Sequence, residues 1–338
     1  MKKNYKVGII GAGNIAKKFH IPAWISNKKI KVNSVADINL EVLNKIKKKF
    51  KIKKIHKSYK NMLKKNNLDI LSISTPPYQH IENILDGIKA NKNIFVEKPF
   101  VMNKKEYFKI KNFLNLKKKS YIQCALHQRY RPVSTSIRNS LIKREIGNLY
   151  FINIIHRRFR NIPKHSHVFS NKKLSGGGPL IDLGWHYFDL VFWLLNFPKI
   201  KKWDCSIFKK IFSNKAMKRY LVYKKFNNEE FVVGNITTSK NVRINFELGY
   251  AINTNKEETK IEFFGDKGCI TWPEKNYYVL KKNKLVKKKF SLSNKLASRL
   301  QIDDFLKKME YPKNTNTNLK EYFYTINLIE KLYKASQK

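Results

Sequence analysis

Residues 7–16 read VGIIGAGNIA, an apolar run followed by a glycine turn and a second apolar stretch. The run Val7–Ile10 is typical of a buried strand, and glycines at 11 and 13 followed by Ala16 have the spacing of a turn that begins a helix. The glycines let the backbone approach a pyrophosphate closely, and Ala16 is small enough for the helix to pack on the strand. The stretch predicts the first turn of a doubly wound α/β domain.

The alternation of apolar and amphipathic segments continues to about residue 125. Alternation at this spacing predicts βαβ units, and thus a parallel sheet covered on both faces, over residues 1–123. The expected strands are Val7–Ile10, Val32–Ala36, Ile70–Ser74, Ile94–Val96 and Tyr121–Ala125, and the expected helices are Ile15–Ser26, Leu40–Phe50, His80–Ala90 and Lys104–Leu116.

From residue 124 onward strands follow one another without helices between them. This pattern predicts an α+β domain over residues 124–338 with an antiparallel or mixed sheet that is open on one face. The expected strands are Tyr150–Phe159, Lys202–Lys209, Glu230–Thr238, Val242–Ala251, Thr259–Phe264, Cys269–Trp272 and Tyr277–Leu280. The expected helices are Val133–Lys143, one that ends at Leu195, Ser298–Met309 and Leu319–Ser336.

Composition limits the classes of protein that fit. The 338 residues carry a net charge of +47, which is usual for nucleic-acid binders. However, Lys and Asn are spread over the whole chain and only 10 of the 71 basic residues are Arg, so we expect no specific nucleic-acid partner. No apolar run reaches the roughly 18 residues of a membrane span, and the three cysteines show no paired spacing. We expect a cytoplasmic protein without membrane, metal or disulfide framework.

Asp37 indicates which ligand the glycine turn binds. It ends the second expected strand, where a carboxylate accepts hydrogen bonds from ribose hydroxyls, and no Arg follows it to bind a 2′-phosphate. NAD is therefore favoured over NADP; the alternative is a glycine turn and a capping Asp without a cofactor. The expected cofactor contacts are Gly11, Gly13, Asn14, Ile15, Asp37, Thr75, Pro76, His80, Glu97 and Lys98.

Two further motifs carry polar side chains suited to proton transfer. Glu97-Lys98-Pro99 closes a strand, at the edge of a parallel sheet where ligands bind. Residues 176–186, GGGPLIDLGWH, place Asp182 and His186 one helical turn apart on the same face. We expect the glycines at 176–178 to let a ligand approach this face closely.

Together, GAGNIA, STPP, EKP and GGGPLIDLGWHYFDL resemble the Gfo/Idh/MocA family of oxidoreductases, and the late KIEFFGDKGCITW extends the likeness over essentially the whole chain. The resemblance implies a Rossmann domain followed by an α+β domain with a large open, mainly antiparallel sheet, and a homodimer or homotetramer. It implies that Lys98, Asp182 and His186 are catalytic. It also implies a cis peptide bond between Lys98 and Pro99.

The chemistry expected of these residues is hydride transfer between a nicotinamide and a secondary alcohol or ketone of a sugar or cyclitol. His186 would act as acid and base, Lys98 would stabilise the alkoxide, and Asp182 would hold substrate hydroxyls or the imidazole. Asp189, three residues beyond His186, either orients that imidazole or is a solvated or capping carboxylate.

The substrate is less sharply indicated. We expect Arg129 and Tyr130 to contact it, together with Asp182 and His186. Seven of the ten Arg lie between residues 129 and 160, which favours an anionic or nucleotide-linked sugar unless these side chains simply face solvent. His165 and His167 have a spacing found in metal sites, but no carboxylate or Cys lies nearby in the sequence.

Two other functions fit the same motifs. One is a glycosidase or lyase in which bound NAD oxidises the sugar only transiently. The other is a regulatory protein that binds nucleotide without catalysis, for which a set of proton-transfer residues would be superfluous.

Overall fold

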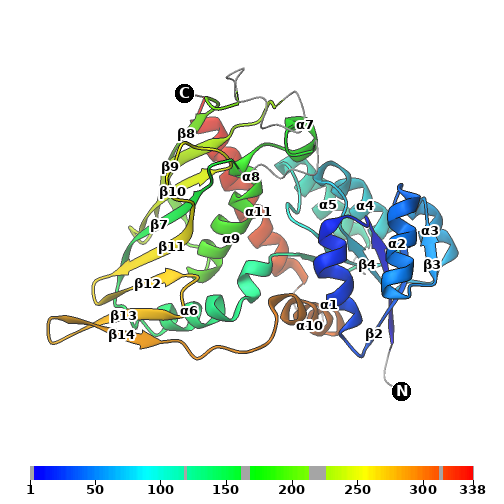
Figure 1. Cartoon of the computed structure of the whole chain (residues 1–338), viewed down its shortest axis with the longest axis horizontal. Coiled ribbons are helices and arrows are strands. Elements are labelled where there is room, and N and C mark those ends of the chain that lie inside the picture. Colours follow the sequence, from blue (N-terminus) through cyan, green and yellow to red (C-terminus); the bar gives the residue numbers. More distant parts are fainter. Residues whose placement is uncertain (1–3, 118–119, 161–167, 213–225, 312–314, 338) are drawn as a thin grey trace. The chain divides into compact units, whose positions relative to one another are not determined.

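The computed structural model describes residues 4–117, 120–160, 168–212, 226–311 and 315–337 (Figure 1). The chain packs into two compact units, residues 1–127 with 295–322 and residues 128–294 with 323–338. The chain thus returns to the first unit near its C-terminus. The division into a dinucleotide-binding domain over residues 1–123 and a substrate-binding and oligomerisation domain over residues 124–338 stays a prediction.

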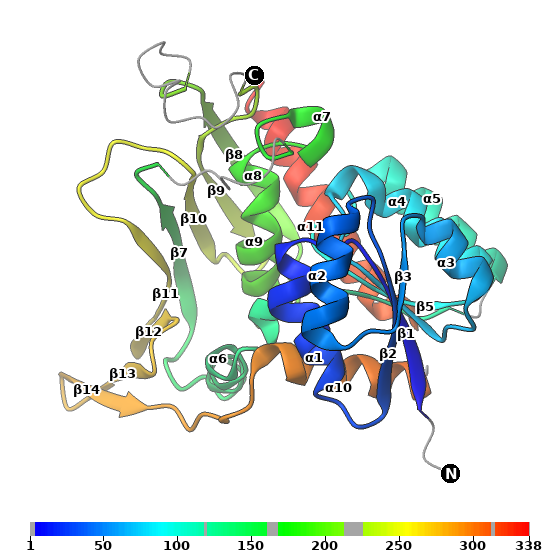
Figure 2. The same cartoon turned by 45° about the vertical axis from the view of Figure 1, so that its right-hand side comes forward.

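The first unit is built on a parallel sheet, which confirms the expected doubly wound domain. Within the described residues it has six strands in the order β3-β2-β1-β4-β5-β6. Their central residues, such as Val7, Ile9 and Ile70, are fully buried because helices cover both faces of the sheet (Figure 2). The strands are β1 Tyr5–Ile10, β2 Ile30–Ala36, β3 Lys54–His56, β4 Ile70–Ile73, β5 Asn93–Val96 and β6 Ile122–Cys124.

In this unit helix α3 (Tyr59–Lys65) was not expected, and the first helix has a local geometry that the sequence pattern did not predict. The expected helix Ile15–Ser26 consists of a π-helical turn, η1 (Ala16–His20), followed by α1 (Ile21–Ile25). Pro22 lacks the N–H that an α-helix needs, and the Ile21 N–H bonds to the carbonyl of Ala16, five residues back. The other helices are α2 Leu40–Phe50, α3 Tyr59–Lys65, α4 Pro77–Lys89, α5 Lys104–Lys117 and α10 Ala297–Glu310.

Helix α10 contributes to the core of the first unit. Phe305 makes edge-to-face contacts with Trp24 and Phe95, with ring centroids 5.7 and 5.6 Å apart. Ile302 and Leu306 pack into the same cluster. Burial of these apolar side chains fixes the returning segment on the unit.

The second unit is built on a larger sheet, as expected. In the described part of the chain it has eight strands in the order β14-β13-β12-β11-β7-β10-β9-β8, and all neighbours are antiparallel except β7 and β10. The strands are β7 Leu149–Arg157, β8 Ile200–Phe208, β9 Phe231–Thr238, β10 Arg243–Gly249, β11 Glu258–Gly265, β12 Gly268–Trp272, β13 Asn276–Lys281 and β14 Lys284–Lys289.

The two faces of this sheet differ in character. Figure 2 shows helix α9 (Gly184–Leu194) against one face. Phe188 of α9 packs on Phe246 of β10, which is paired in register with Ile154 of β7, so the buried Ile154 and Ile152 lie on this face. Asn153 and Arg157 alternate with them and lie on the opposite face, which no described helix of this unit covers. The remaining helical segments near or in this unit are η2 His127–Tyr130, α6 Pro132–Ile142, α7 Lys172–Ser175, α8 Pro179–Asp182 and α11 Thr315–Ala335.

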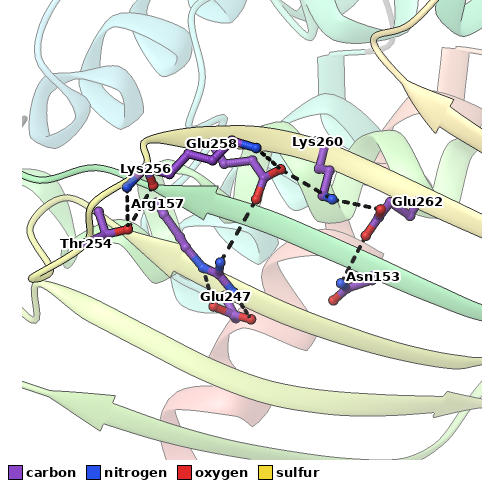
Figure 3. Close-up of polar contacts among 8 residues, drawn as sticks. All are labelled: Asn153, Arg157, Glu247, Thr254, Lys256, Glu258, Lys260 and Glu262. Atoms are coloured by element: carbon purple, nitrogen blue, oxygen red, sulfur yellow. Dashed lines mark hydrogen bonds and ion pairs between the residues drawn. The ribbon is translucent and has the colours of Figure 1, made fainter.

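The open face carries a ladder of alternating charges (Figure 3). Arg157 donates two hydrogen bonds of 2.8 Å to Glu247 across the β7–β10 pair. Lys260 lies 3.3 Å from Glu258 and 2.8 Å from Glu262, its neighbours two residues away on β11. Positive and negative side chains therefore balance locally on a strongly basic protein.

The glycine run before α8 is explained by packing within the second unit. A Cβ on Gly177, whose φ is 156°, would lie 2.0 Å from the Tyr333 hydroxyl, and one on Gly178 would lie 2.3 Å from the carbonyl oxygen of Glu229. The Glu229 carboxylate accepts from the backbone N–H groups of Gly178 (2.9 Å) and Leu180 (3.2 Å) and from Tyr333 (2.7 Å). Packing thus accounts for Gly177 and Gly178. Close approach of a ligand to the glycines at 176–178 stays a prediction.

Removal of the Tyr333 hydroxyl should weaken the hydrogen-bonded packing of Glu229 against the glycine run. Burial and the Glu229 charge raise the pKa of Tyr333 well above its usual value, so the phenol remains a hydrogen-bond donor. We expect Tyr333→Phe to lower the free energy of unfolding by about 1–2 kcal/mol, measured by urea denaturation. Tyr150→Phe, at a side chain 58% exposed, is the control; equal stability of the two variants would contradict this role.

Candidate functional site

The two glycines of the first turn have different roles. Gly11 has a φ of 87°, and a Cβ there would lie 2.7 Å from the backbone of Ser74. Gly13 is exposed, and a Cβ there would meet no atom within 4 Å. Gly11 is therefore required by the fold, whereas Gly13 leaves open space beside an exposed turn, where Asn14 and Ile15 are also exposed.

Asp37 ties this turn to the end of β2. Its carboxylate accepts from the backbone N–H of Ala12 (2.7 Å) and from that of Asn39 (2.9 Å). Each oxygen keeps a further lone pair, so the group can still accept ribose hydroxyls. The next residue, Ile38, is uncharged and 89% exposed. These residues fit an NAD ribose better than a phosphorylated one.

His80 joins the two strand ends that the sequence singled out. One ring nitrogen lies 2.8 Å from the carbonyl oxygen of Pro99 and the other 2.9 Å from that of Thr75. The side chain is 1% exposed, and its burial lowers the pKa of the imidazole. Thr75 and Pro76 remain partly exposed. We therefore interpret His80 as a residue that positions the two strand ends.

Glu97 is held by a buried relay of side chains that was not predicted from the sequence. Trp24 donates to the Ser72 hydroxyl (3.0 Å), Ser72 lies 2.8 Å from His20 Nδ1, and His20 Nε2 lies 2.7 Å from Glu97. Because Trp24 only donates and a carboxylate only accepts, the hydrogens run in one direction along this relay. Burial acts to raise the pKa of Glu97, but the His20 hydrogen bond and nearby positive charges lower it overall.

Lys98 follows at the end of β5. Its backbone N–H donates to Glu97 (3.1 Å), and the expected cis peptide bond to Pro99 is confirmed. The relay thus fixes the backbone that carries Lys98, and the side chain is partly exposed. The sequence signal for His20 was only its place one turn beyond the glycine motif.

In the second unit, Asp182 and His186 lie one turn apart along a continuous helical path through α8 and α9. Asp182 is 8% exposed and accepts a 2.6 Å hydrogen bond from Tyr250 at the end of β10. Burial, together with the Asp182 charge, raises the pKa of Tyr250 well above its usual value, so this donor stays protonated. His186 is partly exposed. Tyr250, distant in sequence, was not predicted.

Asp189 is not solvated, which removes one of its two alternatives. Its carboxylate receives two hydrogen bonds from Arg129, one of 2.7 Å from Nε, and both side chains are at most 10% exposed. The guanidinium carbon of Arg129 also lies 5.5 Å from the Phe197 ring centre. Binding of substrate by Arg129 and Tyr130 stays a prediction, although this guanidinium already neutralises a buried carboxylate.

The arginines clustered in sequence do not form one patch. Arg157 pairs with Glu247 on the open face, because the pleat directs it away from the helices. Others have different partners: Arg138 stacks on Trp193, Arg131 stacks on Trp272, Arg158 contacts Glu257 and Thr259, and Arg160 donates to Ile252 and Asn253. His165 and His167 lie outside the described residues.

The described residues contain no candidate metal site and no candidate membrane-spanning helix. Within them, His, Cys, Asp and Glu side chains form no group of three or more that could hold a metal ion. Of the helices in the described ranges, none has the length and apolar character to cross a membrane.

Two family models match successive parts of this chain. Residues 5–123 match the family model described as "Oxidoreductase family, NAD-binding Rossmann fold", and residues 135–271 match the one described as "GFO/IDH/MocA C-terminal domain". D-glucoside 3-dehydrogenase of Escherichia coli (strain K12) is 25% identical over 79% of this chain and 76% of its own length.

Two further similarities cover most of the chain. Glucose-6-phosphate 3-dehydrogenase of Bacillus subtilis (strain 168) is 27% identical over 75% of this chain and 73% of its own length. The structure of levoglucosan dehydrogenase in complex with NADH and levoglucosan superimposes with a TM-score of 0.84 at 14% identity, over 99% of this chain and 98% of that one. At this identity the likeness establishes the fold.

The contrast between the two turn glycines can be tested. Gly13→Ala should leave the melting temperature within about 2 °C but weaken NAD binding about tenfold or more, since a methyl group would block the approach of the pyrophosphate. Gly11→Ala should destabilise the protein by about 1–3 kcal/mol because of its positive φ and the Ser74 backbone. Calorimetric titration measures the NAD affinity, and thermal unfolding measures the stability. Unchanged NAD affinity in Gly13→Ala would contradict binding of the pyrophosphate at this turn.

Proposed function

The chain belongs to the Gfo/Idh/MocA family of oxidoreductases, and on that premise we propose that it transfers a hydride between NAD and a secondary alcohol or ketone of a sugar or cyclitol. The observation that carries the proposal is the tie between Asp37 and the exposed glycine turn. It provides, in one place, an open approach for a pyrophosphate and an acceptor for a ribose.

When bound, NAD supplies the hydride acceptor for oxidation of the alcohol. The chain's own residues must then remove the hydroxyl proton as the C–H bond breaks. We assign that proton to the imidazole of His186, because histidine titrates near neutral pH. In the reverse direction the protonated imidazole returns the proton to the carbonyl oxygen.

Asp182 and Lys98 complete the proposed set. Asp182 carries a negative charge oriented by Tyr250 and suits either substrate hydroxyls or the charged imidazole. Lys98 carries a positive charge that stabilises developing negative charge on the substrate oxygen. The relay through His20 and Glu97 supports this role by fixing the Lys98 backbone.

The relatives suggest the class of substrate. Two are named as 3-dehydrogenases, one of a glucoside and one of glucose 6-phosphate. We therefore infer that a sugar ring with free secondary hydroxyls is the substrate.

Turnover by purified protein tests the reaction and its residues. With NAD and a panel of glucosides, uronates, sugar phosphates and cyclitols, NADH absorbance should appear with at least one sugar and should be weaker with NADP. His186→Ala and Lys98→Met should each lower kcat about 10²- to 10⁴-fold while NAD affinity stays within threefold. Lys111→Met, an exposed lysine of α5, is the control.

Three other results of these experiments would contradict parts of the proposed function. Full turnover in His186→Ala would refute its role, and a preference for NADP would refute our interpretation of Asp37. Product formation with retained NAD and no net NADH would identify the glycosidase or lyase instead.

We further propose that the protein is a homodimer or homotetramer that assembles through the open face of its larger sheet. Two copies of a protein with a net charge of +47 repel each other least where positive and negative side chains balance. On the open face such a balance exists between three basic and three acidic side chains, namely Arg157, Lys256 and Lys260 with Glu247, Glu258 and Glu262 (Figure 3). Light scattering should show an oligomer that the double variant Glu258→Lys, Glu262→Lys weakens at least tenfold. Glu82→Lys, on the other unit, should have no effect; a monomeric wild type would overturn the proposal.

We propose the cytoplasm as the site of action, because it holds the NAD pool that such an enzyme requires. Cell fractionation with an antibody tests this location, and recovery outside the cytoplasmic fraction would contradict it.

A further inference from the structure

A group of polar side chains on the helix-facing side of the larger sheet has no part in the chemistry described above. We call it the Arg131–His156 cluster; it consists of Arg131, His156, Arg158, Tyr187 and Thr259. His156 of β7 is paired in register with Thr259 of β11, and Tyr187 follows His186 in α9. All five residues belong to the second unit.

Hydrogen bonds connect four members of the cluster. Arg158 donates to the Thr259 hydroxyl (3.0 Å), and His156 Nδ1 lies 3.2 Å from that hydroxyl and 2.9 Å from the hydroxyl of Tyr187. Because Arg158 can only donate, Thr259 keeps its own hydrogen for another acceptor. The hydroxyls of Thr259 and Tyr187 both lie within hydrogen-bond distance of Nδ1 of His156, and we infer that one of them donates to it.

The imidazole of His156 is neutral at physiological pH. Burial lowers its pKa to about 4, and the charge of Arg158 acts in the same direction, against the opposing charges of Asp182 and Glu257. A neutral imidazole that accepts at Nδ1 carries its hydrogen on Nε2. Burial likewise raises the pKa of Tyr187 to about 12, so its hydroxyl stays a donor. His156 therefore presents an N–H group on a partly exposed ring.

Arg131 differs from the other arginines of its segment. Its guanidinium carbon lies 4.9 Å from the centre of the Trp272 ring, and in the described part of the chain its side chain forms neither an ion pair nor a hydrogen bond. Burial lowers its pKa, but an arginine remains charged at neutral pH. Stacking uses the face of the guanidinium and leaves the N–H groups at its edge for another acceptor.

Tyr187 connects the two donors through its neighbours. Its ring packs edge-to-face at 6.2 Å on Trp272, the ring on which Arg131 stacks, and its hydroxyl forms a hydrogen bond with His156. A partly buried positive charge without a carboxylate is costly unless a ligand compensates it. The cluster therefore has the character of a site for acceptor oxygens with negative charge.

We propose that the Arg131–His156 cluster binds an anionic oxygen group of the sugar substrate, with Arg131 as the charged donor and His156 Nε2–H as a neutral donor. This inference rests on the proposed function, since it concerns the substrate of that reaction. It assigns charge selectivity to Arg131 in place of Arg129, because the guanidinium of Arg129 is held by Asp189. A carboxylate and a phosphate share the required chemistry.

Three sugars of equal ring size and different charge test the proposal: methyl β-D-glucoside, D-glucuronate and glucose 6-phosphate. The wild type should prefer one anionic sugar, and the preferred one identifies a carboxylate or a phosphate. Arg131→Gln should lower kcat/KM for that sugar about 10- to 100-fold and leave the value for methyl glucoside within threefold. Arg138→Gln, an arginine that also stacks on a tryptophan, is the matched control.

A binding measurement separates failure of this inference from failure of the proposed function. Calorimetric titration of the NADH-bound protein with each sugar does not depend on turnover. Binding of an anionic sugar that Arg131→Gln weakens, without any turnover, would retain this inference and refute the proposed reaction. Turnover with equal effects of Arg131→Gln on charged and neutral sugars would retain the reaction and overturn this inference.

The position of the hydrogen on the His156 ring gives a second test of the proposed anion site. Nitrogen NMR of the imidazole should show the hydrogen on Nε2 down to about pH 5, and addition of the anionic sugar should shift that signal in the wild type. His156→Leu should weaken binding of the anionic sugar. Protonation of the wild-type ring near pH 6.5, or no shift on addition of any anionic sugar, would overturn its role as a donor.

Discussion

Acceptance of backbone N–H hydrogen bonds by carboxylates is the interaction on which the two units depend. Asp37 holds the N–H groups of the first turn, and Glu229 holds those that begin α8. Glu230 accepts from two further N–H groups, at Ile211 and Phe212. Buried N–H groups must be paired, and carboxylates are the strongest acceptors available. Three of the 24 acidic residues of the chain thus hold backbone N–H groups at turns and at the start of a helix.

The large positive charge has consequences that differ between the surface and the interior. Most lysines are exposed, where their charges are screened and contribute little to stability. Among the described residues, the buried guanidinium of Arg129 is paired with the carboxylate of Asp189. Arg131 departs from this pattern, since its partner in the described chain is only an aromatic face. This contrast, which the net charge does not reveal, is the observation that supports the proposed anion site.

Prediction from sequence succeeded where a signal is local. The parallel sheet, the mainly antiparallel second sheet and most helices follow from hydrophobic periodicity. It missed β3, α3 and β14, whose lysine-rich sequences hide the apolar pattern because these elements lie at the edges or surface of the fold. It joined η1 and α1 into one helix, since the periodicity does not reveal the effect of Pro22 on hydrogen bonding.

Local sequence is sufficient to predict the turn around Gly11 and Gly13, the position of Asp37 and the spacing of Asp182 and His186, because neighbours in the chain fix each of these. The support of the candidate site comes instead from packing between distant segments. Tyr250 reaches Asp182 across 68 positions, and His20 reaches Glu97 across 77. Strand pleating also separated arginines that are adjacent in sequence onto different faces of a sheet. Such contacts depend on which distant segments pack together, and no local pattern encodes that choice.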